Sequence, residues 1–306
     1  MTDLPNVNEQ QGYRAPRNQW WDVWDQFKTH KGALMGAGFF ISMLLFVYVG
    51  PYFWTLDATY IDIRARNSGA SLAHPMGTDQ LGRDTFARMM AGGRTSIAVG
   101  LTAMALSLVL GTLIGVVAGY FKRLDGILMR LTDLFLALPL LPLLLVIIML
   151  FRDTLRFYFG PENGIFILIV FVIGITSWMQ AARIVRGDVL ALKEREFVLA
   201  ARSIGTPPHR MIIRHVLPNV MSPVMVSATL GIANAIITES ALSFLGLGFP
   251  SDYPTWGRLL FDGTDWLQSN PERVIWPGLA ISLTVLSVNY IGDGLRDALD
   301  PRIRGR

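Results

Sequence analysis

The chain has 306 residues, of which 52% are hydrophobic and only 16% charged, and its formal net charge is +4. A soluble domain of this length could not comfortably bury so much apolar surface, so the composition indicates a membrane protein. There is no cysteine, which excludes disulfides, thiolate metal sites and cysteine nucleophiles.

The segment 1–31 is polar and lacks a short apolar core followed by a small-residue cleavage site, so we expect no cleaved signal peptide. Within it, Trp20, Trp24 and Phe27 recur at helical spacing beside two lysines. This pattern suits either a short amphipathic helix in the headgroup region or an ordinary aromatic and basic anchor for the next span.

Six windows are long and apolar enough to cross a bilayer core about 30 Å thick as helices. Their apolar runs are continuous rather than alternating with period two, which predicts a helical bundle and not a barrel. The expected fold class is an all-α integral membrane protein with six transmembrane helices. The predicted spans are residues 32–54, 95–120, 132–150, 164–179, 220–245 and 274–291.

The lysines and arginines are unevenly distributed over the loops between these spans. If the N-terminus is cytoplasmic, the loops on that side carry twice as many as the loops on the other side, as the positive-inside tendency prefers. We therefore expect both termini in the cytoplasm. The arginines of the first external loop, such as Arg83 and Arg88, run against this rule.

The second predicted span repeats a small residue every four positions, at Gly111, Gly115 and Gly119. These glycines share one helix face and permit another helix to approach closely. We favour packing over gating as their role.

The sequence lacks the motifs of several enzyme classes. It contains neither the phosphate-binding loop GxxxxGK[ST] nor the zinc motif HExxH. His209 and His215 are six residues apart, which places them on different faces of a helix. We expect no metal site, no catalytic residues and no enzymatic activity in this chain.

A charged, glycine-punctuated segment lies between the fourth and fifth predicted spans. Residues 188–204 are good helix formers, and four apolar side chains recur there at helical spacing among charged neighbours. Such an amphipathic helix should lie outside the hydrocarbon. The apolar stripe consists of Phe197, Ala200, Ala201 and Ile204, and the charges around it include Glu196 and Arg202.

A turn and a second helix are predicted to follow. Gly205 can end the first helix in a left-handed conformation, while Thr206 and Pro207 supply an N-cap and a first-turn proline. The second helix should end at Pro218, just before the fifth span. This helix, turn and helix could be an ordinary surface hairpin or a docking element for a cytoplasmic partner.

At this segment the residues resemble a known family. FVLAARSIG, residues 197–205, followed by RHVLPN, residues 214–219, is similar to the cytoplasmic coupling loop of ATP-binding cassette importer permeases. That loop has the form Glu-Ala-Ala, three residues, Gly and, about a dozen residues later, Leu-Pro. Ala200, Ala201, Gly205, Leu217 and Pro218 match. Leu199 replaces the family's Glu, and Glu196 offers a nearby carboxylate.

Three further stretches resemble the second permease subunit of dipeptide and oligopeptide importers. They are HPMGTDQLGRD at 74–84, TESALSFLGLG at 238–248 and GDGLRDALDP at 292–301. Nickel importers and some glycoside-linked importers share these motifs. The resemblance covers the chain from about residue 74 to its C-terminus.

The resemblance implies a type I ABC importer permease bundle in a bacterial inner membrane. Such a subunit pairs with a homologous second permease, two cytoplasmic ATPases and an external substrate-binding protein, and it works by alternating access in membrane lipid. ATP and Mg would be bound by the ATPases, which explains the missing phosphate loop. The chain itself would hold no cofactor and bind no nucleic acid.

The resemblance also assigns regions and roles. Residues 1–31 would be a cytoplasmic segment, 32–94 the first span and external loop, and 95–306 the permease core, with the coupling loop at about 180–219. The apolar stripe would insert its side chains into a groove of the ATPase, and Gly205 would be the pivot of the turn. The charges of Glu196 and Arg202 would fix the register of the helix in that groove. The implied coupling residues are Glu196, Phe197, Ala200, Ala201, Arg202, Ile204, Gly205, Leu217 and Pro218.

Glu239 lies within an apolar run, where a carboxylate costs a few kcal/mol unless it is paired, protonated or facing water. Its neighbours Thr238, Ser240 and Ser243 offer hydrogen bonds. We expect a structural role at the external mouth, and keep substrate contact or gating as the alternative.

Two further expectations concern Asp133 and the loop 250–271. Asp133, near the cytoplasmic end of the third span, is expected to pair with Arg130 or to cap its helix. The loop 250–271, with Trp256 and Trp266, is expected to contact the substrate-binding protein.

Two rival functions remain open from the sequence. A secondary transporter or channel would need no ATPase and would use Glu239 as a proton or ion site. A scaffold subunit would have partners but carry no substrate.

Overall fold

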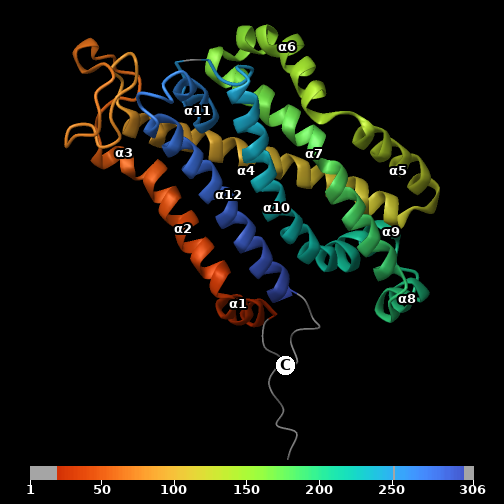
Figure 1. The fold of residues 1–306 in the computed structure, drawn as a ribbon. Helices are drawn as coiled ribbons and strands as arrows, with labels where there is room; N and C mark the ends of the chain where they lie inside the picture. The colour runs from red at the N-terminus through yellow and green to blue at the C-terminus, as the bar shows by residue number, and fades with distance from the viewer. Residues whose placement is uncertain (1–18, 251, 300–306) are drawn as a thin grey trace, which may run out of the picture.

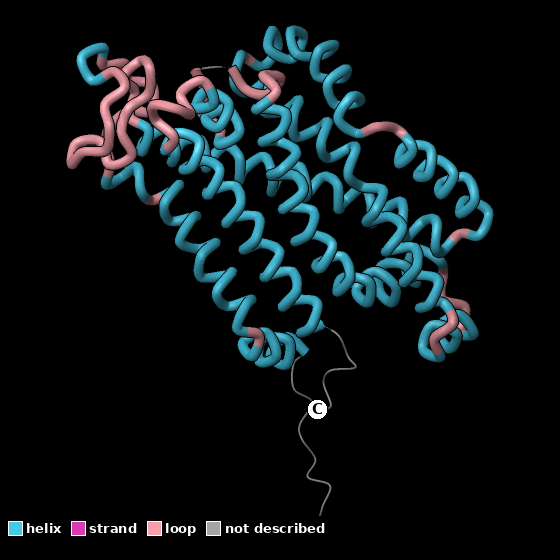
Figure 2. The backbone as a smooth tube through the Cα atoms, in the orientation of Figure 1, coloured by secondary structure: helices cyan, strands magenta, loops and turns pink. Residues whose placement is uncertain are grey.

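The computed structural model describes residues 19–250 and 252–299, and helices make up most of this part of the chain (Figures 1 and 2). The described residues contain no strand, which confirms the all-α fold class. The short helices are α1 (Gln19–Thr29), α3 (Gly50–Phe53), a 3₁₀ turn (Ile63–Ala65), α8 (Glu196–Ser203), α9 (Pro208–Met211), a π segment (Ile212–Val216) and α11 (Trp256–Thr264). The long helices are α2 (Lys31–Tyr48), α4 (Thr85–Tyr120), α5 (Lys122–Ala137), α6 (Leu140–Phe159), α7 (Pro161–Lys193), α10 (Leu217–Phe244) and α12 (Glu272–Leu299).

Within the described residues, five helices are long and apolar enough to cross a membrane, and the number is six if the bent pair α5–α6 counts as one span. These elements correspond to the six predicted spans. The π segment joins α9 to α10, so that 208–244 forms one continuous helical rod of 37 residues.

The third predicted span is not a straight helix. α5 and α6 meet at an angle of 88°. The break falls at Leu138, which adopts an extended conformation (ψ 136°) before Pro139. A proline disfavours helical backbone at the residue before it, so the window 132–150 had to split there.

Two other helices extend well beyond their predicted windows. α4 begins at Thr85 because the Asp84 side chain caps it, accepting a hydrogen bond from the Ala87 amide at 2.7 Å. α7 continues to Lys193 because its late arginines find partners on α5. Arg183 pairs with Asp133, which corrects the expected Asp133–Arg130 pair.

The glycine repeat of α4 packs against α7, as predicted. A Cβ atom at Gly111 would lie 2.7 Å from the Ala181 side chain, and one at Gly119 would lie 2.7 Å from Val189. Gly115 is equally close to the α7 backbone and to Val185. Helices α4 and α7 therefore approach each other too closely for any larger side chain along this stripe.

α1 confirms a short helix before the first span, although the residues before 19 lie outside the described part of the chain. Phe27 is buried beside Ala298 of α12, while Trp24 is 48% exposed. The three predicted aromatic positions therefore do not share one lipid-facing surface: Phe27 packs against protein. The side chain of Trp20 is outside the description, as is Pro301 of the last motif.

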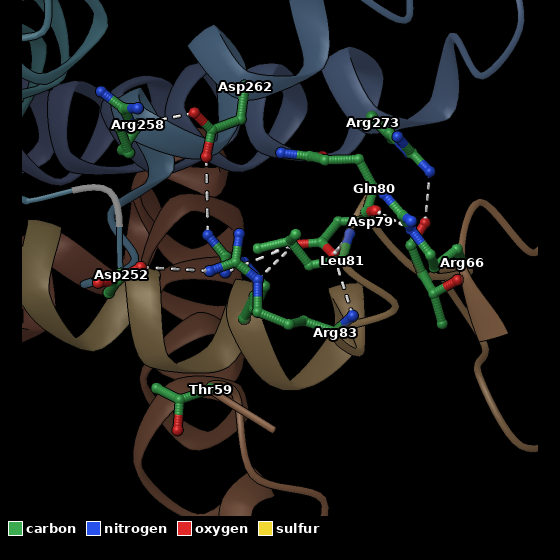
Figure 3. A network of polar contacts seen from close by, with 12 residues as sticks. Thr59, Arg66, Asp79, Gln80, Leu81, Arg83, Asp252, Arg258, Asp262 and Arg273 are labelled. Carbon is green, nitrogen blue, oxygen red and sulfur yellow. Dashed lines mark hydrogen bonds and ion pairs between the residues drawn. The ribbon is translucent and has the colours of Figure 1, made fainter. Parts of the chain in front are cut away.

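The α3–α4 loop (residues 54–84), the first turn of α4 (residues 85–88) and α11 together form a region that we call the polar lobe (Figure 3). Here Arg83 Nε lies 2.6 Å from Asp79 Oδ2. Arg88, only 1% exposed, lies between two carboxylates, with nitrogens 3.5 Å from Asp79 and 3.7 Å from Asp262. Asp262 also pairs with Arg258 at 2.9 Å. Two of the arginines that run against the positive-inside tendency, Arg83 and Arg88, are thus paired with aspartates of the same chain.

Turns of the α3–α4 loop hold this network in place. Gly77 and Gly82 adopt left-handed conformations, with φ of 73° and 79°. His74 Nδ1 lies 2.7 Å from the carboxylate of Asp84, the residue directly before α4, and this carboxylate also accepts a hydrogen bond from Trp54 Nε1 at 3.1 Å. Asp84 therefore fixes the loop and the start of α4 together.

Candidate functional site

The predicted coupling segment forms a hairpin of α8 and α9, residues 196–211, at the end of the bundle away from the α3–α4 loop (Figure 1). α7 and α8 are separate helices rather than the single helix expected over 188–204. The chain breaks at Glu194 and Arg195, and Arg195 is extended (ψ 142°). Lys193 Nζ donates to the last carbonyls of α4, Gly119 O at 3.1 Å and Tyr120 O at 3.2 Å. This contact fixes the point from which the hairpin projects.

The apolar residues of α8 divide between two faces. Val198 and Ala201 are buried at 3% and 8% exposure and pack in one cluster with Met211. Phe197 and Ile204 lie on the other face, 45% and 83% exposed, with Ala200 also exposed. The predicted stripe therefore needs one correction. Ala201 packs inward against the chain itself, so it presents no surface to a partner, whereas Phe197, Ala200 and Ile204 share the outward face.

The turn after α8 has the left-handed glycine that the sequence predicts. Gly205 has φ of 80°, and its amide donates to Arg202 O at 3.0 Å. The Thr206 amide donates to Ala201 O at 3.2 Å, which closes a Schellman-type C-cap. The surroundings of Gly205 are open, so the requirement for glycine is conformational and not steric.

The start of the second helix differs from the prediction by one residue. Pro207 is the N-cap of α9 and Pro208 takes the first turn, so Thr206 does not cap. Pro218 does not end this helix either. It lies in the first turn of α10, directly after the π segment, where a missing amide hydrogen is tolerated. The hairpin is therefore continuous with α10.

The remaining coupling residues lie around this hairpin. Glu196 and Arg202 are exposed and make no ion pair with another described residue. Leu217 is half-buried beside the cluster that holds Ala201, and Pro218 is exposed. The structure thus gathers all the predicted residues at one end of α10.

Glu239 is completely buried. Its carboxylate accepts hydrogen bonds from Ser96 Oγ of α4 at 2.8 Å and from Ser243 Oγ of α10 at 2.7 Å. Ser96 Oγ in turn accepts from the Trp256 amide at 3.3 Å. Glu239 therefore ties together α4, α10 and α11, and this geometry favours the structural role over contact with substrate.

The same geometry corrects the expectation for Trp256. Its side chain is 0% exposed, and its Nε1 donates to Met89 O at 3.0 Å. It cannot contact another protein. Trp266 is half-buried, and the Arg273 guanidinium lies 5.0 Å from the centre of its ring.

A cavity of about 340 Å³ lies where the bend between α5 and α6 faces α7 and α10. Glu239 does not line it. Among the lining residues are Gln180 of α7 and Asn234 of α10, which the sequence analysis did not single out. The available signal was the presence of two amide side chains within otherwise apolar spans, where polar groups are costly unless they have a function or a partner.

The bundle, its cavity between helices and the hairpin at one end define a multi-pass membrane transport subunit. The chain belongs to the family described as "Binding-protein-dependent transport system inner membrane component", whose family model matches residues 107–305. A second model, "N-terminal TM domain of oligopeptide transport permease C", matches residues 18–75. These matches confirm the resemblance to ABC importer permeases.

Named relatives cover nearly the whole chain. It is 36% identical to the dipeptide transport system permease protein DppC of Alkalihalophilus pseudofirmus, over 99% of this chain and 97% of the relative. It is 37% identical to the oligopeptide transport system permease protein OppC of Bacillus subtilis, over 93% and 90%. It is 35% identical to the glutathione transport system permease protein GsiD of Pectobacterium atrosepticum, over 99% and 97%.

Proposed function

We propose that this chain forms half of the translocation path of an ATP-driven importer of dipeptides or oligopeptides. It would pair with a homologous second permease in the bacterial inner membrane. Two cytoplasmic ATPases, which bind ATP and Mg, would dock on the α8–α9 hairpin, and an external binding protein would deliver the substrate. The names of the relatives support the peptide class.

The observation that carries the coupling role is the outward face of α8. Phe197, Ala200 and Ile204 expose apolar surface on a short helix with a small residue at its centre, which suits insertion into a groove of a partner. Exposed large apolar side chains at the end of a membrane bundle favour a protein contact. Glu196 and Arg202 on the same helix would set register.

The continuous rod 208–244 offers a route for coupling. At about 1.5 Å per residue, its 37 residues make roughly 55 Å of helix, which bends between α9 and α10 (Figure 1) and runs from the hairpin past the central cavity. A displacement of α8 by ATPase closure would move α10 as a unit, with Gly205 as the pivot. The bundle would then alternate between inward-open and outward-open states.

The orientation follows from the same scheme. The hairpin would face the cytoplasm with both termini, and the polar lobe would face outward. Because Arg83, Arg88 and Arg258 are paired with aspartates of the same chain, these three arginines give little argument against this orientation.

A secondary transporter or channel is less well supported. That function would use Glu239 as a proton or ion site, but this carboxylate is fully buried and does not line the central cavity. An exposed coupling face would also have no purpose there.

Affinity purification of the tagged chain in mild detergent, with mass spectrometry of the accompanying proteins, tests the proposal. We expect a second six-span permease together with two ATPases, or one ATPase in two copies. The purified complex in liposomes should take up di- or tripeptides only with ATP and a binding protein. A chain that purifies alone, and moves substrate under an ion gradient, would overturn the proposal.

A further inference from the structure

The lining of the central cavity is mostly apolar, but it includes several polar side chains and no formally charged one among the described residues. Its lining contains no Asp, Glu, Lys, Arg or His. Two charged residues of the adjoining helices have partners of their own, because Asp133 pairs with Arg183 and Glu239 accepts a hydrogen bond from Ser96. The polar lining groups are Thr176, Ser177, Gln180, Ser227, Asn234 and Thr238.

Most of these polar groups lack a partner. The Thr176 and Thr238 hydroxyls donate to carbonyls one turn earlier on their own helices, at 2.7 and 2.8 Å. The side chains of Gln180 and Asn234 make no hydrogen bond with any other described residue, and both are exposed.

The position of these amides decides what they can face. Gln180 and Asn234 lie near the middle of α7 and α10, two helices that qualify as membrane spans. An amide group that faced hydrocarbon there without a hydrogen bond would cost several kcal/mol. This face of the bundle is therefore expected to border water or a polar occupant rather than lipid.

The cavity has the size of a ligand site. Its volume of about 340 Å³ falls within the range of roughly 300–1,000 Å³ found for small-molecule pockets. An amide side chain offers two N–H donors and one C=O acceptor, which are the groups that complement a peptide bond. Neutral groups cannot discriminate between cationic and anionic side chains by charge pairing.

We infer that Gln180 and Asn234 form a neutral amide-binding site on the translocation path, which hydrogen-bonds the main chain of a passing peptide whatever the charge of its side chains. This inference rests on the proposed function and specifies which groups of the substrate the permease recognises. The hydrophobic surface around the amides accommodates side chains without selecting among them. The site thus lets peptides of any charge pass, and any selection of peptides by charge is made by other subunits.

The absence of cysteine permits a direct test on the assembled transporter. Gln180→Cys and Asn234→Cys would each place a single thiol in this chain. A membrane-impermeant, water-soluble thiosulfonate should modify both, as detected by the mass of the chain. The matched control is Leu113→Cys, because Leu113 is 59% exposed on α4 but does not line the cavity, and we expect it to react slowly.

Protection by substrate is the second readout. The thiol for this readout is Leu230→Cys, because Leu230 lines the cavity, is 46% exposed and leaves both amides in place. Trialanine, trilysine and triglutamate, each at ten times its half-saturating concentration, should slow its modification by about tenfold and to a similar extent. Modification no faster than at Leu113→Cys would overturn the inference. So would modification that no peptide slows, or that peptides of only one charge slow.

Uptake separates this inference from the proposed function. Asn234→Leu should lower uptake of all three peptides by about tenfold, the loss expected from one hydrogen-bond partner. Asn234→Asp should lower uptake of triglutamate more than that of trilysine. If the unsubstituted complex takes up none of these peptides, the proposed function fails. If it takes them up and Asn234→Leu does so equally well, only the amide site fails.

Discussion

The polar lobe and the α8–α9 hairpin are both rich in charged residues, but they use them in opposite ways. In the polar lobe Arg88 is buried between two aspartates, and Asp84 ties three segments together. In the hairpin Arg202 is exposed and has no described ion-pair partner, and the outward apolar face is uncovered. The first region pairs buried charges within the chain, whereas the second leaves charged and apolar groups exposed. Substitutions in the polar lobe should therefore change mainly the stability of the chain, and substitutions in the hairpin mainly the binding of partners.

The largest expected effect is the loss of a buried arginine. Arg88→Leu leaves Asp79 and Asp262 without their shared cation, which should destabilise the chain by about 3–5 kcal/mol. The matched substitution Arg202→Leu in the hairpin should change stability by less than about 0.5 kcal/mol. Thermal unfolding of both variants in the same detergent measures the difference. Equal stabilities would contradict the contrast between the two regions.

The second prediction concerns the pivot of the hairpin. Gly205→Val forces a β-branched residue to adopt φ of 80°, so we expect transport to be abolished at unchanged subunit levels. Gly205→Asn is the control, because asparagine tolerates this conformation and the space around Gly205 is open. Peptide uptake is the measurement. Normal uptake by the valine variant would refute the pivot assignment.

The third prediction separates the two faces of α8. Ala200→Trp adds bulk to the outward face and should weaken co-purification of the ATPases without changing the thermal stability of the chain alone. Ala201→Trp adds the same bulk inside the cluster around Met211, so it should lower that stability instead. Both readouts should be taken on both variants. Unaltered ATPase recovery with Ala200→Trp would mean that the docking face is elsewhere.

The smallest expected effect is a pH dependence in the polar lobe. Burial raises the pKa of Asp262 above its ordinary value, against the opposing effects of Arg258 and Arg88. A raised pKa means that the folded state binds the proton more tightly. The resulting stability is fully present below about pH 3.9, the unfolded value, and is lost as the pH rises through the folded pKa.

Unfolding temperatures of the unsubstituted chain and of Asp262→Asn, compared from acid to neutral pH, check this sign. We expect the unsubstituted chain to lose stability relative to the variant as the pH rises. Asp265→Asn, just beyond α11, is the matched surface control. If the unsubstituted chain instead gained stability relative to Asp262→Asn as the pH rises, the ion pairs of Asp262 with Arg88 and Arg258 would outweigh the effect of its burial.

Local signals alone determined several features of this protein. The length of apolar runs gave the spans, because a bilayer accepts only helices of sufficient length. The requirement for a left-handed residue identified the turn at Gly205, and the four-residue glycine repeat identified the α4 face that packs on α7. The break between α5 and α6 also has a local cause, because Pro139 disfavours a helical backbone at Leu138.

Other features depended on residues far apart in the sequence, and only the tertiary structure decided them. A period of 3.6 residues shows that α8 is amphipathic, but not that Ala201 packs beside Met211 while Ala200 faces outward. Likewise, no local pattern pairs Asp133 with Arg183, buries Arg88 between two carboxylates or brings Gln180 and Asn234 to one cavity. The physical reason is that burial and pairing are fixed by whichever helix packs opposite, and that helix is specified elsewhere in the chain.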